Sequence, residues 1–198
     1  MSAWCLSEPA PVETRPLTLI DIPIQPPSAR EVLVKIDACG ICRTDLHIVE
    51  GDLPQWRTPV VPGHQIVGRV VEVGGEVENL REGDRVGIAW LGRTCGECVY
   101  CRTGRENLCT SPSLTGWNVD GGFAEYTVAD ARFTYPLPDS FTDEQAAPLL
   151  CAGIIGYRAL RLTGLNERGW SGARIGIYGF GAAGHVAIQL ARARGADV

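Results

Sequence analysis

Four segments in the first two thirds of the chain alternate apolar with polar residues or are almost continuously apolar, with many β-branched side chains. This pattern is typical of β-strands. Turn-forming glycine, proline and aspartate residues separate the segments, which favours an antiparallel, loop-rich, barrel-like body. The four predicted strands cover residues 31–38, 65–73, 84–89 and 123–128.

The pattern changes after residue 142. Residues 144–162 are rich in alanine and leucine and predict a connecting helical segment. Residues 173–178 predict a short buried strand, and a glycine turn leads from it into a helix over 182–194, which Gly195 closes as a C-cap. One such unit cannot bury both faces of a parallel sheet, so we expect an incomplete doubly wound α/β domain and a truncated chain.

Length, composition and net charge favour some classes of protein over others. The 198 residues are 45% hydrophobic and 21% charged, which fits one globular domain, or one domain and part of another. The net charge of −5 gives no general attraction to nucleic acid or to anionic lipid. We find no membrane span and no signal peptide, and therefore expect a cytoplasmic protein with small-molecule ligands.

Four cysteines form a C-x2-C-x2-C-x7-C run. At this spacing four thiolates can close tetrahedrally on one zinc ion, which leaves no position for a substrate. The run therefore predicts a structural lobe over about residues 93–111. A zinc-stapled module for protein or nucleic-acid interaction is the alternative, but the acidic balance and the spacing argue against it. The four cysteines are Cys95, Cys98, Cys101 and Cys109.

A second set of metal-ligand residues is spread along the chain. Cys42, His64 and Cys151 could form a site with two thiolates and one imidazole, and the fourth tetrahedral position would stay open for water or substrate. That arrangement is typical of a catalytic zinc. The alternative is three unrelated buried residues.

A glycine motif, Gly179-x-Gly181-x-x-Gly184, follows the last predicted strand and opens a helix. In this context glycines let a pyrophosphate approach the positive N-terminus of the helix. A plain strand-to-helix turn is the alternative. The acidic residue that would hold the ribose is expected about 20 residues further on, at or beyond the last residues, so NAD and NADP are not distinguished.

Together these motifs resemble the zinc-dependent medium-chain alcohol dehydrogenases. The resemblance implies a GroES-like catalytic domain over residues 1–142 and the beginning of a Rossmann domain over 143–198. It rests on GICRTD-x-H at 40–47, PGH at 62–64, the four-cysteine run, LLCAG at 149–153 and GFGAAG at 179–184.

The resemblance also implies roles for the metal-ligand residues and their neighbours. Cys42, His64 and Cys151 would bind a catalytic zinc, and the four-cysteine run a structural zinc. Asp45 would orient His64 by accepting its second N–H, although a helix cap is a fair alternative. Thr44 and His47 would relay the proton of the alcohol to solvent, where an ordinary surface histidine is the alternative for His47.

Further roles follow from the same resemblance. Arg43 would meet the pyrophosphate of the cofactor, together with the three glycines of the motif, unless it is a solvated surface arginine. Trp56, Trp90 and Trp117 are candidates for the substrate pocket or for core packing. Gln65 departs from the family, which usually has glutamate after the zinc histidine, and the amide removes a charge beside the metal.

The function implied by the resemblance is the interconversion of an alcohol and an aldehyde or ketone by hydride transfer to NAD or NADP. Its cofactors would be one catalytic and one structural zinc ion and the nicotinamide nucleotide. We expect no nucleic-acid or membrane partner, and a homo-oligomer at full length. The alternative is a truncated fragment that binds zinc without turning over.

Overall fold

The computed structural model describes residues 1–54 and 57–198. Contacts along the chain divide it into two compact units, Met1–Ala147 and Pro148–Val198, and each is described by itself. The predicted domain boundary after residue 142 stays a prediction.

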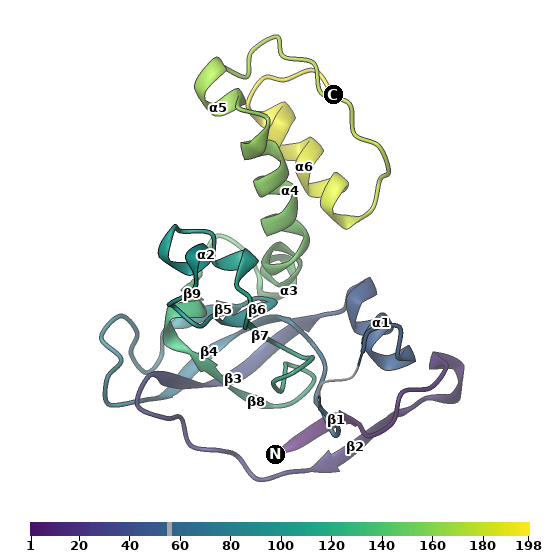
Figure 1. The fold of residues 1–198 in the computed structure, drawn as a ribbon, viewed down its shortest axis with the longest axis vertical. Coiled ribbons are helices and arrows are strands. Elements are labelled where there is room, and N and C mark those ends of the chain that lie inside the picture. Colours follow the sequence, from purple (N-terminus) through teal and green to yellow (C-terminus); the bar gives the residue numbers. More distant parts are fainter. Residues whose placement is uncertain (55–56) are drawn as a thin grey trace. The chain divides into compact units, whose positions relative to one another are not determined.

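The first unit is built on a five-stranded antiparallel sheet in the order β8-β3-β4-β5-β9, coloured from blue-violet to green in Figure 1. Its side chains form a core of aliphatic residues from β3, β4 and β5. At Gly68 a Cβ atom would lie 2.2 Å from the carbonyl oxygen of Lys35, so only glycine permits β3 and β4 to approach there. The strands are β3 (Glu31–Gly40), β4 (Gln65–Val73), β5 (Arg85–Ile88), β8 (Tyr126–Asp130) and β9 (Thr134–Pro136).

Two small hairpins complete the strands of this unit. β1 (Ser2–Leu6) pairs with β2 (Leu17–Asp21) at the N-terminus. β6 (Leu91–Arg93) pairs with β7 (Ser113–Leu114) and closes the base of the four-cysteine lobe. The short helices of the unit are η1 (Val12–Thr14), α1 (Arg43–Glu50), α2 (Val99–Arg102), η2 (Glu106–Leu108), η3 (Ala131–Phe133) and α3 (Asp143–Ala146).

Arg85 of β5 binds the last segment of the first unit through hydrogen bonds. Its side chain is 7% exposed and donates from Nε and Nη2 to Asp143, at 2.9 and 2.6 Å. The remaining guanidinium hydrogens meet the carbonyl oxygens of Pro138 and Phe141. The start of α3 is also capped by Thr142, whose hydroxyl accepts from the backbone N–H three residues on. This segment is therefore held to β5 by directed bonds.

The second unit contains two longer helices and a short one. α4 (Ala152–Leu162) packs against α6 (Ala182–Ala193). The two helices approach so closely at Gly156 that a Cβ atom there would lie 2.9 Å from the carbonyl oxygen of Ala183. η4 (Ala147–Leu150) leads into α4, and α5 (Leu165–Arg168) follows it. No helix among the described residues is long and apolar enough to cross a membrane.

The structure contains most of the strands and helices that the sequence predicts. The strands expected at 31–38, 65–73 and 84–89 are present, and the helix over 182–194 is confirmed, with Gly195 at φ +89° after its end. The strand expected at 123–128 begins three residues late, because residue 124 only bridges to β1.

The helical segment expected over 144–162 is confirmed, and it is divided into α3, η4 and α4, since Pro148 lacks an N–H and disfavours helical geometry in the residue before it. One predicted element is wrong. The strand expected over 173–178 does not form. Among the described residues it pairs only through the bridge between Arg174 and Asp197, and one bridge does not make a ladder.

Candidate metal centres and active site

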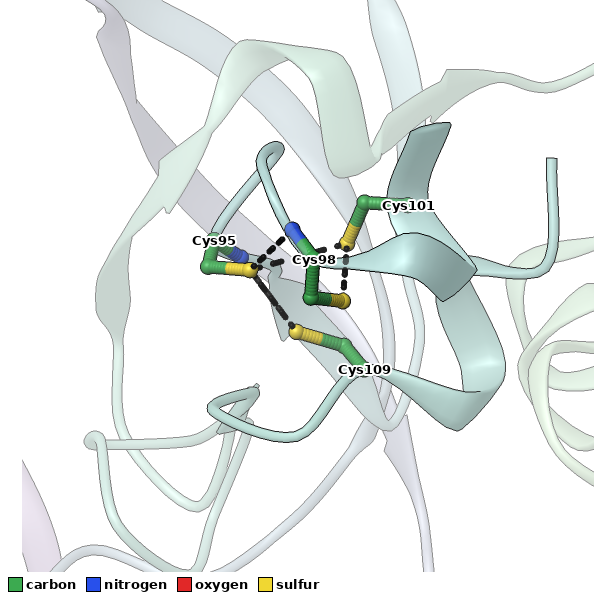
Figure 2. Close-up of side chains that lie close together, drawn as sticks. All are labelled: Cys95, Cys98, Cys101 and Cys109. Atoms are coloured by element: carbon green, nitrogen blue, oxygen red, sulfur yellow. Dashed lines mark hydrogen bonds between the residues drawn. The ribbon is translucent and has the colours of Figure 1, made fainter. Parts of the chain in front are cut away.

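The four cysteines of the lobe point toward one another (Figure 2). Cys95 follows β6, Cys98 is the N-cap residue of α2, Cys101 lies within α2, and Cys109 follows η2, so one short segment of the chain brings them together. Their sulfur atoms all lie within 4.8 Å of one another, and the eight cysteines of the chain, all described, form no disulfide.

The sulfur–sulfur separations fit a tetrahedral zinc site. They are 3.5 Å for Cys98–Cys101 and Cys95–Cys109, and 3.8 Å for Cys95–Cys101. Zinc–sulfur bonds of about 2.3 Å in a regular tetrahedron place the sulfurs about 3.8 Å apart. Backbone N–H groups of Cys95, Cys98 and Ser111 also point at the sulfurs, which favours the thiolate form that binds metal.

These backbone groups act on the thiols unequally. The N–H of Cys101, followed by that of Thr110, lowers the pKa of Cys98 to about 6. The pKa of Cys109 is also lowered, mainly by the N–H of Cys95. Desolvation instead raises the pKa of Cys101 to about 11. Part of the site is therefore ready to ionise near neutral pH, and the remaining protons leave when metal binds.

The second candidate centre is built around the beginning of α1. Cys42 is the N-cap residue of this helix, and its Sγ lies 3.3 Å from Nε2 of His64. A tetrahedral zinc with one sulfur and one nitrogen ligand would hold these atoms about 3.6 Å apart. His64 comes just before β4 and is 1% exposed, so its imidazole is fixed within the protein. The pair is placed as two ligands of one ion would be.

Asp45 orients both of these residues. Its side chain is 2% exposed, and its Oδ1 lies 3.0 Å from Nδ1 of His64. Its Oδ2 accepts the backbone N–H of Cys42 at 2.8 Å, which completes the capping box of α1. A carboxylate only accepts hydrogen bonds, so Nδ1 carries the hydrogen and Nε2 presents its lone pair toward the thiol. Asp45 therefore has both of the roles considered for it: Oδ2 caps the helix and Oδ1 orients His64.

Thr44 and His47 lie three residues apart on α1, on the same face of the helix. The backbone N–H of Thr44 donates to Sγ of Cys42 at 3.3 Å, so this residue adjoins the candidate metal ligand. His47 is near the end of the helix, with a side chain 38% exposed and Nδ1 2.7 Å from Oδ2 of Asp52. The two residues lead from the buried centre toward solvent.

An aromatic wall stands beside His64. The ring of Trp90 meets the imidazole edge-on, with centroids 5.0 Å apart, and stacks on Trp117 at 5.8 Å. Both tryptophans also contact the apolar cluster of Leu6, Ile48 and Val60, so core packing is part of their role. The third candidate, Trp56, lies outside the described residues.

Two further residues, Gln65 and Cys39, lie beside the centre. Gln65 is 3% exposed and lies over Gly40, and its Nε2 is the one buried side-chain polar atom without a hydrogen-bond partner among the described residues. Cys39 packs against Gly63 and Gly122, and burial raises the pKa of its thiol to about 12. The thiol of the half-buried Cys39 therefore packs as a small apolar group.

Cys151 belongs to the second unit, where it is the N-cap residue of α4. Because the two units are described separately, its place as a third ligand stays a prediction. Arg43 is exposed at the first position of α1, as a phosphate-binding or a solvated arginine would be.

The glycine turn has the local geometry that a dinucleotide-binding turn requires. Gly179 has φ +90°, and Gly181 is the N-cap residue of α6 and lacks a capping side chain. A Cβ on Gly184 would lie 3.0 Å from the carbonyl oxygen of Gly179 and 3.3 Å from Ile177. The first glycine thus permits the turn and the third permits the close packing behind it. The backbone N–H groups at the start of α6 remain available to an anion.

The β fold and the thiolate-rich centres are those of a zinc-binding dehydrogenase. The family model for the alcohol dehydrogenase GroES-like domain matches residues 28–139. The chain belongs to the zinc-dependent medium-chain alcohol dehydrogenase family, and its first unit is the GroES-like domain.

Individual relatives agree with this assignment. A probable alcohol dehydrogenase AdhA of Mycobacterium tuberculosis is 50% identical over all of this chain, which covers 58% of that protein. A protein named CAD of Helicobacter pylori, solved with NADP(H), has a TM-score of 0.84 and 28% identity over 99% of this chain and 58% of its own. A cobalt- and zinc-bound thermostable alcohol dehydrogenase of Pyrobaculum aerophilum has a TM-score of 0.86 and 26% identity over 99% and 57%. The chain thus spans a little over half the length of these relatives.

Proposed function

We propose that this chain carries the zinc-binding part of an enzyme that interconverts an alcohol with an aldehyde or ketone by hydride transfer to NAD or NADP. Cys42, His64 and Cys151 bind the catalytic zinc, and the four cysteines of the lobe bind the structural zinc. Small alcohols or aldehydes are the substrates. The family membership and the relatives named above support this assignment.

One observation carries the proposal. The buried His64 donates a hydrogen bond from Nδ1 to Asp45 and turns its other nitrogen toward the thiol of Cys42, at 3.3 Å. A buried imidazole with its tautomer fixed by a carboxylate is the arrangement that metal-binding histidines adopt. A histidine that served only the core would not need a thiol at its second nitrogen.

When bound, zinc supplies a Lewis acid that makes the alcohol hydroxyl more acidic, and NAD or NADP supplies the acceptor for the hydride. The residues of this chain position the reactants and move the proton. Asp45 keeps the imidazole of His64 aligned. Thr44 takes the proton of the alcohol through its hydroxyl, and His47 passes it to solvent from its half-exposed position.

The remaining residues bind the two substrates. Trp90 and Trp117 form an apolar wall beside His64, against which the carbon chain of the alcohol packs. Arg43 and the turn around Gly179 and Gly181 bind the pyrophosphate, the first by its planar donors and the second by backbone N–H groups.

Zinc content and turnover, measured on the same preparation, test this function. We expect about two zinc ions per chain after a chelator wash, and about one in Cys42→Ser. Nicotinamide-dependent oxidation of a series of small alcohols should then be lost in Cys42→Ser and kept in a Cys5→Ser control, since Cys5 is a buried cysteine of β1 outside both centres. Zinc retention without turnover in the unmodified chain would instead support the alternative of an inactive zinc-binding fragment.

A further inference from the structure

Asp52 makes two contacts with His47 at the end of α1. Its Oδ2 lies 2.7 Å from the imidazole Nδ1, and its backbone N–H donates to the carbonyl oxygen of His47 at 2.9 Å. Gly51 makes this possible, because its φ of +80° turns the chain back over the last turn of the helix. A Cβ at that position would also lie 2.9 Å from Pro9. The pairing is thus built into the way the helix ends.

The chemistry of this contact determines which nitrogen of His47 can exchange a proton. An ionised carboxylate can only accept, so the hydrogen between the two groups belongs to Nδ1. Neutral His47 then has its lone pair on Nε2. Protonated His47 has hydrogens on both nitrogens, and the one held by Asp52 is the one retained on deprotonation. Proton transfer is therefore confined to Nε2 in both protonation states.

We propose that Asp52 is a positioning residue for the proton relay, which holds the imidazole of His47 in the Nδ1–H tautomer and leaves Nε2 as the atom that accepts and releases the proton. This inference rests on the relay role of His47 in the proposed function. Asp52 itself touches neither substrate nor metal. Its effect on turnover should pass entirely through His47.

A contribution to folding stability explains the contact between Asp52 and His47 less well than a role in positioning the imidazole. The side chains of His47 and Asp52 are 38% and 59% exposed, and ion pairs this exposed contribute little to folding. The backbone bond from Asp52 to the helix needs no carboxylate, so replacing the side chain leaves the helix end in place. What the carboxylate adds is a fixed orientation and tautomer of the ring.

The first test is the tautomer of His47 by NMR of the zinc-loaded chain labelled with ¹⁵N in histidine. The chain has only three histidines, and His64 has its own carboxylate partner, which makes the assignment tractable. We expect the Nδ1–H signature in the unmodified chain and a shift toward the Nε2–H form, which dominates in free histidine, in Asp52→Ala. Glu50→Gln removes a charge from the same helix end and should change nothing. An unchanged His47 signature in Asp52→Ala would overturn the proposal.

The second test is kinetic and uses a double-mutant cycle. We expect Asp52→Ala to lower kcat about tenfold, within the range of general acid–base catalysis, with KM for the alcohol unchanged. The same substitution should have no further effect in a His47→Ala background. An equal loss in both backgrounds would show that Asp52 does not act through His47 and would refute the proposal. A His47→Ala variant with full kcat would refute the relay in the proposed function, and the NMR result would still report on Asp52.

Discussion

Asp45 offers the sharpest test of the candidate catalytic centre, because both of its oxygens are committed. Oδ2 accepts the N–H of Cys42 and Oδ1 accepts the Nδ1–H of His64, and the side chain is 2% exposed. Asp45→Asn keeps the shape but has only one acceptor oxygen. One of the two N–H groups must then face an NH₂ group.

Either orientation of the new amide is costly. If its oxygen stays on Cys42, its NH₂ group donates to Nδ1 of His64, and the hydrogen of the imidazole moves to Nε2, which can then no longer bind metal. If its oxygen turns to His64, the partly buried N–H of Cys42 loses its partner. An unsatisfied buried donor costs about 1–3 kcal/mol, so in this orientation we expect the free energy of unfolding to fall by up to that amount.

The assay is competition for zinc by a chelator, with the four-cysteine lobe as an internal reference. We expect one zinc equivalent of Asp45→Asn to be lost at a 10- to 100-fold lower chelator concentration, as for other residues that orient metal ligands. The second equivalent should keep its wild-type resistance. Asp139→Asn, in an exposed loop, is the matched control. If Asp45→Asn holds both zinc ions as tightly as the unmodified chain and unfolds with the same free energy, neither orientation of the amide is costly and Asp45 does not orient a metal ligand.

Four further predictions concern the lobe and the sheet. Cys109→Ser should lower the zinc content by one equivalent, measured by elemental analysis, whereas Cys5→Ala should leave it unchanged. Because the pKa of Cys98 is lowered to about 6 and that of Cys101 is raised to about 11, iodoacetamide at about pH 7.5 should label Cys98 first in the metal-free chain, and peptide mapping that finds Cys101 first would contradict this. The zinc affinity of the lobe should likewise fall more steeply below about pH 6, where Cys98 of the metal-free chain carries a proton that zinc must displace, while raising the pH should not weaken binding. Arg85→Met removes the guanidinium from a carboxylate and two carbonyl groups and should lower the free energy of unfolding by about 2–3 kcal/mol in urea denaturation; a loss below about 0.5 kcal/mol would show that these bonds are not stabilising.

Local patterns were enough for much of the fold. Three of the five predicted strands needed only the alternation of side chains across a sheet, and the helix ending before Gly195 needed only its period and its cap. The hairpin of β1 and β2 was not predicted. β2 is largely exposed, so its sequence lacks the burial signal, and a loop that contains η1, rather than a short turn with a recognisable signal, joins it to its partner β1.

The sequence by itself determined the four-cysteine lobe, because its ligands lie within 15 residues and their spacing alone defines a closed site. It also identified Cys42 and His64 as candidate ligands, but spacing could not tell a metal site from separate buried residues. Only the tertiary structure decided that His64 turns one nitrogen to Cys42 and the other to Asp45, and that His47 is paired with Asp52. The contacts of His64 depend on where β4 and α1 meet, and the pairing of His47 depends on how Gly51 turns the chain at the end of α1. In both cases burial and hydrogen bonding select the side-chain directions after the backbone is in place.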